Sequence, residues 1–213
     1  MKIVFFSFYF PPDIGAGSFR AITLANSLKN KLKSSDELHV ITSHPNRYAS
    51  YVEKAADIES HGNLIIHRIK VPMHRGSMRS QIITFLVFAY SAFKLSRLIK
   101  PDFFIGTSSR LMTALLTRFC SSFHNRKYYI DLRDIFSETI ADVLTLKNKF
   151  IGSFSRFLFI FLEKLVLKSA SGVNVVSGGF PEYFEKLGID TSKWSFFPNG
   201  VDHEFKNLSL ANN

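Results

Sequence analysis

The sequence predicts an α/β fold: a single Rossmann-like domain built on a doubly wound, mostly parallel sheet. Short apolar segments alternate with longer segments of helical periodicity along the 213 residues, which is the order of repeated strand–helix–strand units. The apolar segments are continuous, as in parallel strands that are covered on both faces. Hydrophobic residues make up 46% of the chain, enough to form a sizeable core. No internal repeat or linker divides the sequence, so we expect one domain.

The expected strands are rich in Val, Ile, Leu and Phe, and turn-forming residues bound most of them. The first leads into Pro11-Pro12-Asp13 without the small-residue cleavage site of a signal peptide. The last ends at Pro198-Asn199-Gly200, where proline and an Asn-Gly turn direct the chain out of the sheet. In chain order, the expected strands are Lys2–Phe8, Leu38–Thr42, Leu64–Val71, Phe103–Gly106, Lys127–Asp131, Gly172–Val176 and Trp194–Phe197.

The expected helices carry apolar residues at intervals of three and four. In the first helix, Ala21, Leu24, Ala25 and Leu28 form such a stripe. In chain order, the expected helices are Ser18–Leu32, Met78–Lys100, Ser109–Phe123, Lys149–Ser169 and Gly179–Leu187.

Two of these helices are apolar enough to raise the question of a membrane span. The segment Ile82–Phe93 has only about half the length of a span before charged residues follow. The segment Phe150–Leu167 is long enough, but it contains Arg156, Glu163 and Lys164. We expect both segments to be helices of a soluble domain that can lie against a membrane without crossing it.

The formal net charge of +10 is unevenly distributed. Between Glu59 and Asp131 the only acidic residue is Asp102. A field of one sign favours anionic lipid, phosphate or nucleic acid, although ordinary solvated helix faces in a basic protein explain it equally well. A nucleic-acid partner is not expected, because no nucleic-acid-binding motif accompanies the charges. The basic residues of this stretch are Arg68, Lys70, Arg75, Arg79, Lys94, Arg97, Lys100, Arg110, Arg118, Arg126 and Lys127.

Cysteine and histidine usage argues against a disulfide or a metal centre. Cys120 is the single cysteine, so the chain forms no internal disulfide and no thiolate metal cluster, as expected for a reducing cytoplasm. Its place in a helical segment predicts a buried, small hydrophobic side chain. The seven histidines show no paired spacing on a helix, so no metal site is expected.

The loop after the first strand, Tyr9–Gly17, is a candidate phosphate-binding site. Gly15, Ala16 and Gly17 let a ligand approach the backbone, and the free N–H groups at the start of the following helix attract phosphate. The alternative is a glycine-rich turn without a ligand. The loop is not a dinucleotide fingerprint, because Arg20 stands at the third glycine position, and no Gly-Lys-Ser/Thr of a P-loop occurs.

A second candidate site follows the strand that ends at Asp131. The segment Asp131–Glu138 places three carboxylates and one guanidinium at the carboxyl end of a strand, where open α/β sheets bind ligands, and Asp131, Arg133 and Asp134 are its candidate catalytic residues. Such a cluster is costly unless its charges are paired or functional. Arg133 could equally be an internal ion-pair partner that fixes the loop. The cluster is not a metal-binding Asp-x-Asp motif, because a cation occupies its third position.

Together, these motifs resemble the N-terminal domain of glycosyltransferase family 4, whose members are retaining enzymes of the GT-B fold. The resemblance covers nearly the whole chain, from Lys2 to Asp202, and each motif is weak singly but strong in this order. The Arg133-Asp134 form is similar to the subgroup that builds O-antigen and capsule, including L-fucosamine transferases. The markers are Tyr9-Phe10-Pro11-Pro12 with Gly15-Ala16-Gly17, Asp131-x-Arg133-Asp134, Glu163, Ala170-Ser171-Gly172-Val173, Val176-Ser177 and Pro198-Asn199-Gly200-Val201-Asp202.

The resemblance implies a division of labour between two domains. The N-terminal domain holds the acceptor, while a C-terminal domain grips the nucleotide-sugar donor, and transfer takes place between them without a metal or another cofactor. It implies that Gly15, Ala16 and Gly17 approach the donor diphosphate or sugar. The loop with Asp131, Arg133 and Asp134 would face the acceptor and the reacting centre, and this loop lacks the catalytic histidine of some relatives.

The resemblance also implies a domain organisation. Residues 1–200 would form the acceptor-binding domain and residues 201–213 the start of an interdomain hinge, with the C-terminal donor-binding domain absent from these residues. We therefore expect an inactive half of a glycosyltransferase of the hexosyltransferase type. The alternative is a non-catalytic Rossmann-like module that docks on a membrane or on a partner.

The basic region then gains a candidate role. Acceptors in surface polysaccharide synthesis are commonly glycans on a polyprenyl diphosphate, so we expect a peripheral protein at the inner face of the cytoplasmic membrane. Arg75, Arg79, Lys94 and Arg97 would contact the acceptor diphosphate and the anionic membrane surface. The aromatic residues expected to rest on lipid beside them are Phe85, Phe88, Tyr90 and Phe93.

Overall fold

The computed structural model describes residues 1–46, 54–73, 77–108, 111–137 and 149–200. One eight-stranded sheet runs through them, in the order β3-β4-β2-β1-β5-β6-β7-β8. Each neighbouring pair is parallel except β3 and β4. The strands are β1 (Lys2–Phe6), β2 (Glu37–Ser43), β3 (Ile58–His61), β4 (Leu64–Ile69), β5 (Phe103–Ser108), β6 (Lys127–Leu132), β7 (Gly172–Val175) and β8 (Ser195–Phe196).

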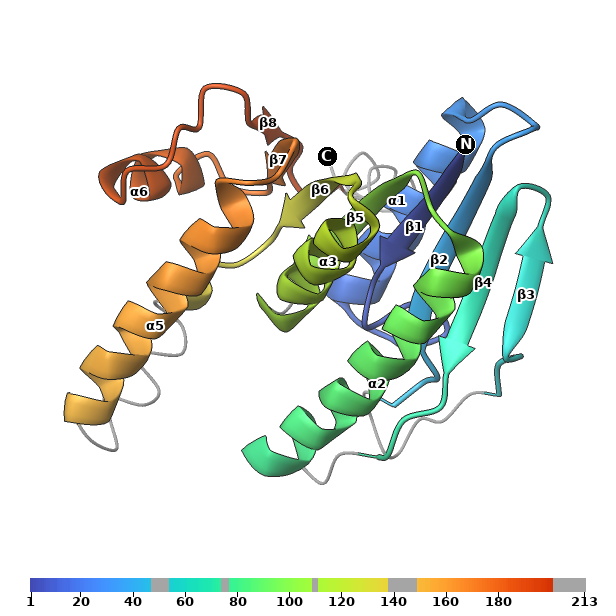
Figure 1. Ribbon diagram of the computed structural model, residues 1–213, viewed down its shortest axis with the longest axis horizontal. Helices are drawn as coiled ribbons and strands as arrows, with labels where there is room; N and C mark the ends of the chain where they lie inside the picture. The colour runs from blue at the N-terminus through green and yellow to red at the C-terminus, as the bar shows by residue number, and fades with distance from the viewer. Residues whose placement is uncertain (47–53, 74–76, 109–110, 138–148, 201–213) are drawn as a thin grey trace, which may run out of the picture.

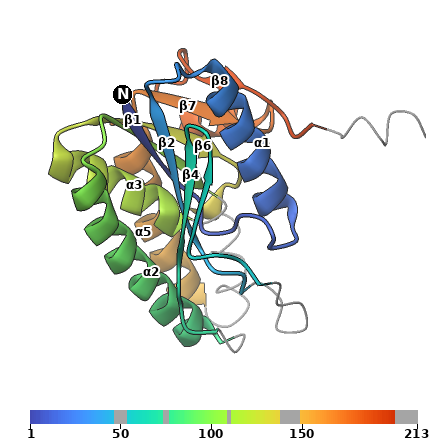
Figure 2. The same ribbon diagram turned by 90° about the vertical axis from the view of Figure 1, so that its right-hand side faces the viewer.

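The described helices lie on both faces of this sheet, which gives three layers (Figures 1 and 2). Helix α1 covers one face, and α2, α3 and α5 lie side by side on the other. The chain therefore winds outward in both directions from β1, and the predicted doubly wound α/β fold is confirmed. The helices are α1 (Ala16–Lys31), α2 (Met78–Ile99), α3 (Leu111–His124), α5 (Lys149–Leu167) and α6 (Phe180–Lys186).

The core is divided between the two faces of β1, whose side chains alternate. Ile3 and Phe5 pack toward α1, where Ala21 and Ala25 are buried. Val4 and Phe6 belong to the cluster on the other face, which includes residues of α2, α3, α5 and α6. Because both faces of the central strands are covered, these strands read as continuous apolar runs in the sequence.

Most of the expected elements are present within a few residues, but one strand was missed. β3 pairs antiparallel with β4 at the edge of the sheet, and its residues are mostly exposed. Because Ile58-Glu59-Ser60-His61 buries almost nothing, it lacks the apolar run that revealed the other strands. Ser109, Arg75 and the expected hinge at residues 201–213 lie outside the described residues.

Helix α2 is the one described helix that is long and apolar enough to cross a membrane. It packs on the sheet through Phe85, Phe88 and Ala92, all of them buried. The expectation that Phe85 and Phe88 rest on lipid is therefore wrong: both rings contact Phe8 in the core. Helices that pack in the core of a soluble protein share this length and composition.

Cys120 is fully buried in α3, as the sequence predicts. Burial in this apolar layer raises the pKa of its thiol to about 12. A thiol that stays protonated is a poor nucleophile, so Cys120 acts as a packing residue.

Gly106 in β5 allows α3 to approach the sheet closely. A Cβ atom at Gly106 would lie 2.1 Å from Oγ1 and 2.9 Å from Cβ of Thr117, which is fully buried. Gly106→Ala should therefore lower the free energy of unfolding by about 1–3 kcal/mol, measured by urea denaturation. Gly178→Ala is the matched control, because the added Cβ would meet no atom within 4 Å. Thr117→Ala should recover part of the loss, and an undiminished stability of Gly106→Ala would contradict the close approach.

His39 and His67 make the fold sensitive to acid. Nδ1 of His39 lies 3.0 Å from Nε2 of His67 on neighbouring strands, and the rings are stacked. Burial, with repulsion from His39, lowers the pKa of His67 from 6.5 to about 4. The unfolded chain binds more protons between these values, so stability should fall as the pH drops from about 6.5 toward 4, by at most about 3 kcal/mol. Urea denaturation across this range should show the slope, and His67→Gln should flatten it; parallel curves would refute the assignment.

Candidate functional site

The carboxyl ends of the parallel strands form one edge of the sheet, and the two loops singled out by the sequence both lie there. The strand order reverses between β1 and β5, and such a switch point is where open α/β sheets bind ligands. The loop after β1 leads into α1, and the loop after β6 follows Asp131 and Leu132, the last two residues of that strand. The structure therefore brings these two predicted regions to the same edge.

Hydrogen bonds to neighbouring strands fix the loop after β1. The carbonyl oxygen of Phe8 accepts from Oγ of Ser43 at 2.6 Å, and the carbonyl oxygen of Pro11 accepts from Nη2 of Arg68 at 2.7 Å. The buried carboxylate of Asp13 accepts from the backbone N–H of Asn46. The loop thus enters α1 in one defined path.

Gly15 starts α1 with a backbone conformation that other residues rarely adopt, at φ 156° and ψ 158°. The helix begins at Ala16, two residues earlier than predicted, and its first turn contains no acidic residue. Ala16 is exposed and Gly17 is buried. The first N–H groups of a helix lack intrahelical partners and carry its positive dipole end, so this turn can receive an anion.

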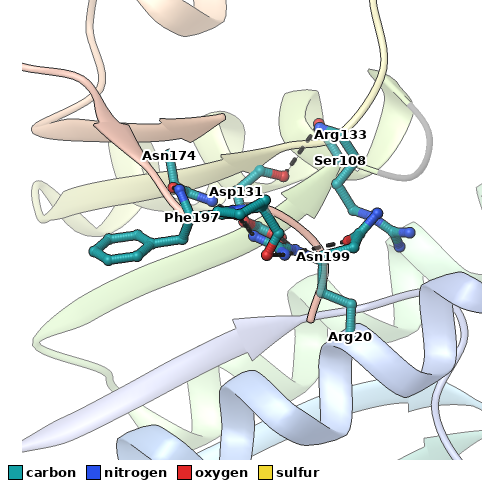
Figure 3. Close-up of polar contacts among 8 residues, drawn as sticks. Arg20, Ser108, Asp131, Arg133, Asn174, Phe197 and Asn199 are labelled. Carbon is teal, nitrogen blue, oxygen red and sulfur yellow. Dashed lines mark hydrogen bonds and ion pairs between the residues drawn. The ribbon is translucent and has the colours of Figure 1, made fainter. Parts of the chain in front are cut away.

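Arg20 and Asp131 form a bidentate ion pair between α1 and β6 (Figure 3). Nε and Nη2 of Arg20 donate to the two carboxylate oxygens of Asp131 at 2.8 and 2.7 Å. Asp131 is only 2% exposed, and Oδ1 also accepts from Nδ2 of Asn174 at 2.7 Å. Asp131 thus has a donor on each oxygen, an arrangement that suits a positioning residue; the catalytic role expected for it stays a prediction.

The same network holds the chain where it leaves the sheet after β8. The backbone N–H of Phe197 donates to Oδ1 of Asn174 at 2.9 Å. Arg20 donates to the carbonyl oxygens of Phe197 and Pro198 and to Oδ1 of Asn199, at 3.0 to 3.3 Å. One guanidinium therefore joins the first helix, the sixth strand and the exit of the chain.

The loop after β6 is fixed on both sides of Asp134. Oγ of Ser108 donates to the carbonyl oxygen of Asp131 and accepts from the backbone N–H of Arg133, each at 3.3 Å. Farther along, the buried carboxylate of Glu163 accepts from the backbone N–H groups of Phe136 and Ser137 at 2.8 and 3.2 Å.

Between these two attachments, Arg133 is half-buried and Asp134 is exposed. The protein nevertheless removes enough water around Asp134 to raise the pKa of its carboxyl, while Arg133 acts in the opposite direction. Asp134 is therefore the accessible carboxylate of the predicted cluster.

Of the expected basic residues of α2, Lys94 and Arg97 are not part of this edge. Lys94 and Arg97 lie in the second half of α2, which leads to the start of β5, and α2 is on the sheet face opposite to α1. Arg79 is exposed in the first turn of α2. The described residues contain no group of three His, Cys, Asp or Glu side chains arranged to hold a metal ion.

A separate cavity of about 520 Å³ lies on the other side of α1 from Arg20. Asn26 and Lys29 of α1 face it, and it reaches Pro12, Glu59 and Arg68. Its lining carries both positive and negative charge: Nη1 of Arg68 lies 2.7 Å from Oε1 of Glu59, and the two side chains form an ion pair.

Arg20 and Asn174 were not predicted as site residues, although the sequence carries a signal for each. Arg20 lies one turn after Gly17, next to Ala21 on the buried side of α1, where a charged residue requires a partner. Asn174 interrupts the apolar run Gly172–Val176, so its amide had to bind within the sheet.

No protein-family model and no curated protein sequence matches the chain. Solved structures do share its fold. One structure of sucrose-phosphate synthase from Thermosynechococcus elongatus is 12% identical with a TM-score of 0.64, and the match covers 99% of this chain and 96% of that one. A second structure of the same protein is 11% identical with a TM-score of 0.67, and the match covers 100% of this chain and 52% of that one. HepE from Anabaena in complex with UDP-glucose is 14% identical with a TM-score of 0.53, covering 100% of this chain and 51% of that one.

The lipopolysaccharide outer core galactosyltransferase WaaB is also similar, with 13% identity, a TM-score of 0.50, and coverage of 95% and 46%. The chain thus spans about half of the length of HepE, WaaB and the longer sucrose-phosphate synthase chain. At these identities the similarity establishes the fold, which is that of one lobe of a GT-B glycosyltransferase.

Arg20→Met should destabilise the protein by about 3–5 kcal/mol, because it leaves the buried carboxylate of Asp131 without its charge partner. Urea denaturation measures the loss, and hydrogen exchange at the Phe197 amide should accelerate as the chain exit loosens. Asp131→Asn removes the charge, so in the double variant the two losses should be clearly less than additive. Strictly additive losses would show that the two side chains do not depend on each other.

Proposed function

We propose that the chain is one lobe of a glycosyltransferase that moves a sugar from a nucleotide-sugar to an acceptor hydroxyl. The observation that carries this proposal is the start of α1: a helix that begins at Ala16, after the N-cap Gly15, without an acidic first turn, at the carboxyl edge of a sheet with the GT-B fold. A nucleotide-sugar is the donor class that fits, because its diphosphate needs backbone N–H groups and positive potential. HepE, which has the same fold, was solved with UDP-glucose.

The reaction breaks the bond between the anomeric carbon and the diphosphate, which leaves with the bonding electron pair. The acceptor oxygen forms the new bond and gives up its proton. In the proposed arrangement, the first turn of α1 stabilises the charge that develops on the diphosphate. Asp134 is the candidate group for the acceptor proton, since it is exposed and its raised pKa makes it a better base than an ordinary aspartate. Arg133 adds positive charge beside it.

Asp131 supports this site through other residues in our proposal. Its ion pair with Arg20 sets the position of α1 against β6, and thus the position of the helix start relative to Asp134. We further propose that transfer retains the anomeric configuration and needs no metal or other cofactor.

The proposed acceptor is a glycan on a polyprenyl diphosphate, in the synthesis of a bacterial surface polysaccharide such as O-antigen or capsule. WaaB, one of the proteins with this fold, is a lipopolysaccharide galactosyltransferase. In this proposal, the present lobe makes the smaller part of the contacts with the donor, and a second lobe binds most of the nucleotide. The isolated 213-residue chain should accordingly bind UDP-glucose weakly.

The test is a transfer assay with the product of the complete reading frame that encodes the chain. Radiolabelled nucleotide-sugars are supplied with lipid-linked acceptors, and label should move to the lipid fraction for one donor. Ala16→Asp places a negative charge at the start of α1, which repels a diphosphate but suits the helix dipole. It should lower transfer at least tenfold (on the order of the effect of removing one stabilising contact) without lowering stability.

Ala16→Ser is the matched control, because it keeps the turn neutral and should leave transfer nearly unchanged. Full activity of Ala16→Asp would contradict the role of α1. Transfer from no nucleotide-sugar would overturn the proposed enzyme and favour the non-catalytic docking module.

A further inference from the structure

Helix α5 exposes an apolar stripe that would normally face a core. Phe154, Phe157, Leu158 and Phe161 stand at positions i, i+3, i+4 and i+7, which is the spacing of one helix face. All four are exposed, and Phe154 and Phe157 are 69% and 71% exposed. A stripe of this kind on a helix predicts a partner surface.

Helix α2 shows the same feature on the same side of the sheet. Ile82, Leu86 and Tyr90 recur at every fourth residue and are all more than half exposed, whereas Phe85 and Phe88 point into the core. Because helices run antiparallel to the strands here, the first halves of α2 and α5 lie toward the carboxyl edge of the sheet (Figure 1). Both exposed stripes therefore lie at the end of the molecule that holds the candidate site.

The charge of this helical layer has one sign. α2, α3 and α5 contain a single acidic residue, Glu163, and its buried carboxylate binds backbone N–H groups. The layer therefore presents no acidic side chain to solvent from these helices. Its basic residues include Arg79, Lys94 and Arg97 on α2, Arg118 on α3, and Arg156 and Lys164 on α5.

We propose that the outer face of α2 and α5, called the docking face, binds an anionic lipid bilayer. A bilayer supplies both features that this face requires: an apolar layer for Phe154, Phe157 and Leu86, and a negative headgroup layer for the surrounding Lys and Arg. A second copy of the chain is a poor occupant, since it would place two basic surfaces against each other. An interfacial helix inserts its apolar side chains to about 5–10 Å while its basic residues stay with the headgroups.

This proposal differs from the surface expected from the sequence. The apolar contact comes from α5 and from the outer stripe of α2, and not from Phe85 and Phe88. The membrane-binding proposal does not depend on the proposed transfer reaction, because it rests only on the exposed apolar side chains and the positive charge of the docking face. It also brings the end of the molecule that holds the candidate site close to the membrane, where a lipid-linked molecule can be met.

Vesicle co-sedimentation of the 213-residue chain tests the docking face. The chain should bind vesicles of phosphatidylcholine with phosphatidylglycerol, bind pure phosphatidylcholine at least about tenfold more weakly, and lose binding as salt is raised. The double variants Phe154→Ser with Phe157→Ser, and Arg79→Glu with Lys94→Glu, should each weaken binding at least about tenfold.

Matched controls lie on α1, on the opposite face of the sheet. Phe19→Ser removes an aromatic ring of similar exposure, and Lys31→Glu reverses an exposed charge. Neither should change vesicle binding. Urea denaturation of every variant verifies that these surface changes leave the fold intact.

Three outcomes would overturn the proposal: binding that ignores anionic lipid, binding that survives loss of the two phenylalanines, or equal losses in the α1 controls. A concentration-dependent dimer that Phe154→Ser and Phe157→Ser dissolve would instead assign the face to a second copy. No nucleotide-sugar enters these experiments, so failure of the transfer assay leaves their outcome unaffected.

Discussion

The position of the candidate site depends on one buried ion pair. Arg20 binds both oxygens of Asp131, and the remaining bonds of the pair reach Asn174 and the backbone after β8. A buried pair of this kind adds little net stability over apolar packing, but removing one partner strongly destabilises the elements that the pair joins. Here those elements are α1, β6, β7 and the exit of the chain, which together form the carboxyl edge of the sheet.

That arrangement gives the two loops different tasks. The start of α1 is left open, with exposed Ala16 and no acidic side chain in its first turn, whereas Asp131 is enclosed by three donors. Glu163 performs a similar function farther along the loop after β6, where its buried carboxylate accepts from the backbone N–H groups of Phe136 and Ser137. Two buried carboxylates thus hold the backbone of this edge, and the exposed Asp134 lies between their attachment points in the sequence.

The fold was predictable from the sequence because both faces of its central strands are buried, so that β1, β2, β5 and β6 appear as apolar runs. β3 was not predictable in this way, since its four residues follow no burial pattern and their pairing with β4 is a tertiary effect. The two loops of the site could be identified from their glycines and charged residues. The ion pair that connects them could not be predicted, because Arg20 and Asp131 are separated by 111 positions and only folding brings them together. Likewise, the spacing in α2 identified a helix but could not tell which of its aromatic residues, Phe88 or Tyr90, faces the core.

The two outermost strands have a consequence for solubility. A strand at the edge of a sheet offers unpaired backbone groups to which another polypeptide can add, the first step of aggregation. In this protein β8 pairs through two residues only, and β3 is a four-residue strand that carries Glu59 and His61. Neither edge is a long, flat template for a foreign strand. The exposed phenylalanines of the docking face lie on a helix instead. A helix whose side chains bind a surface keeps its backbone hydrogen bonds, so this binding does not add a strand to the sheet.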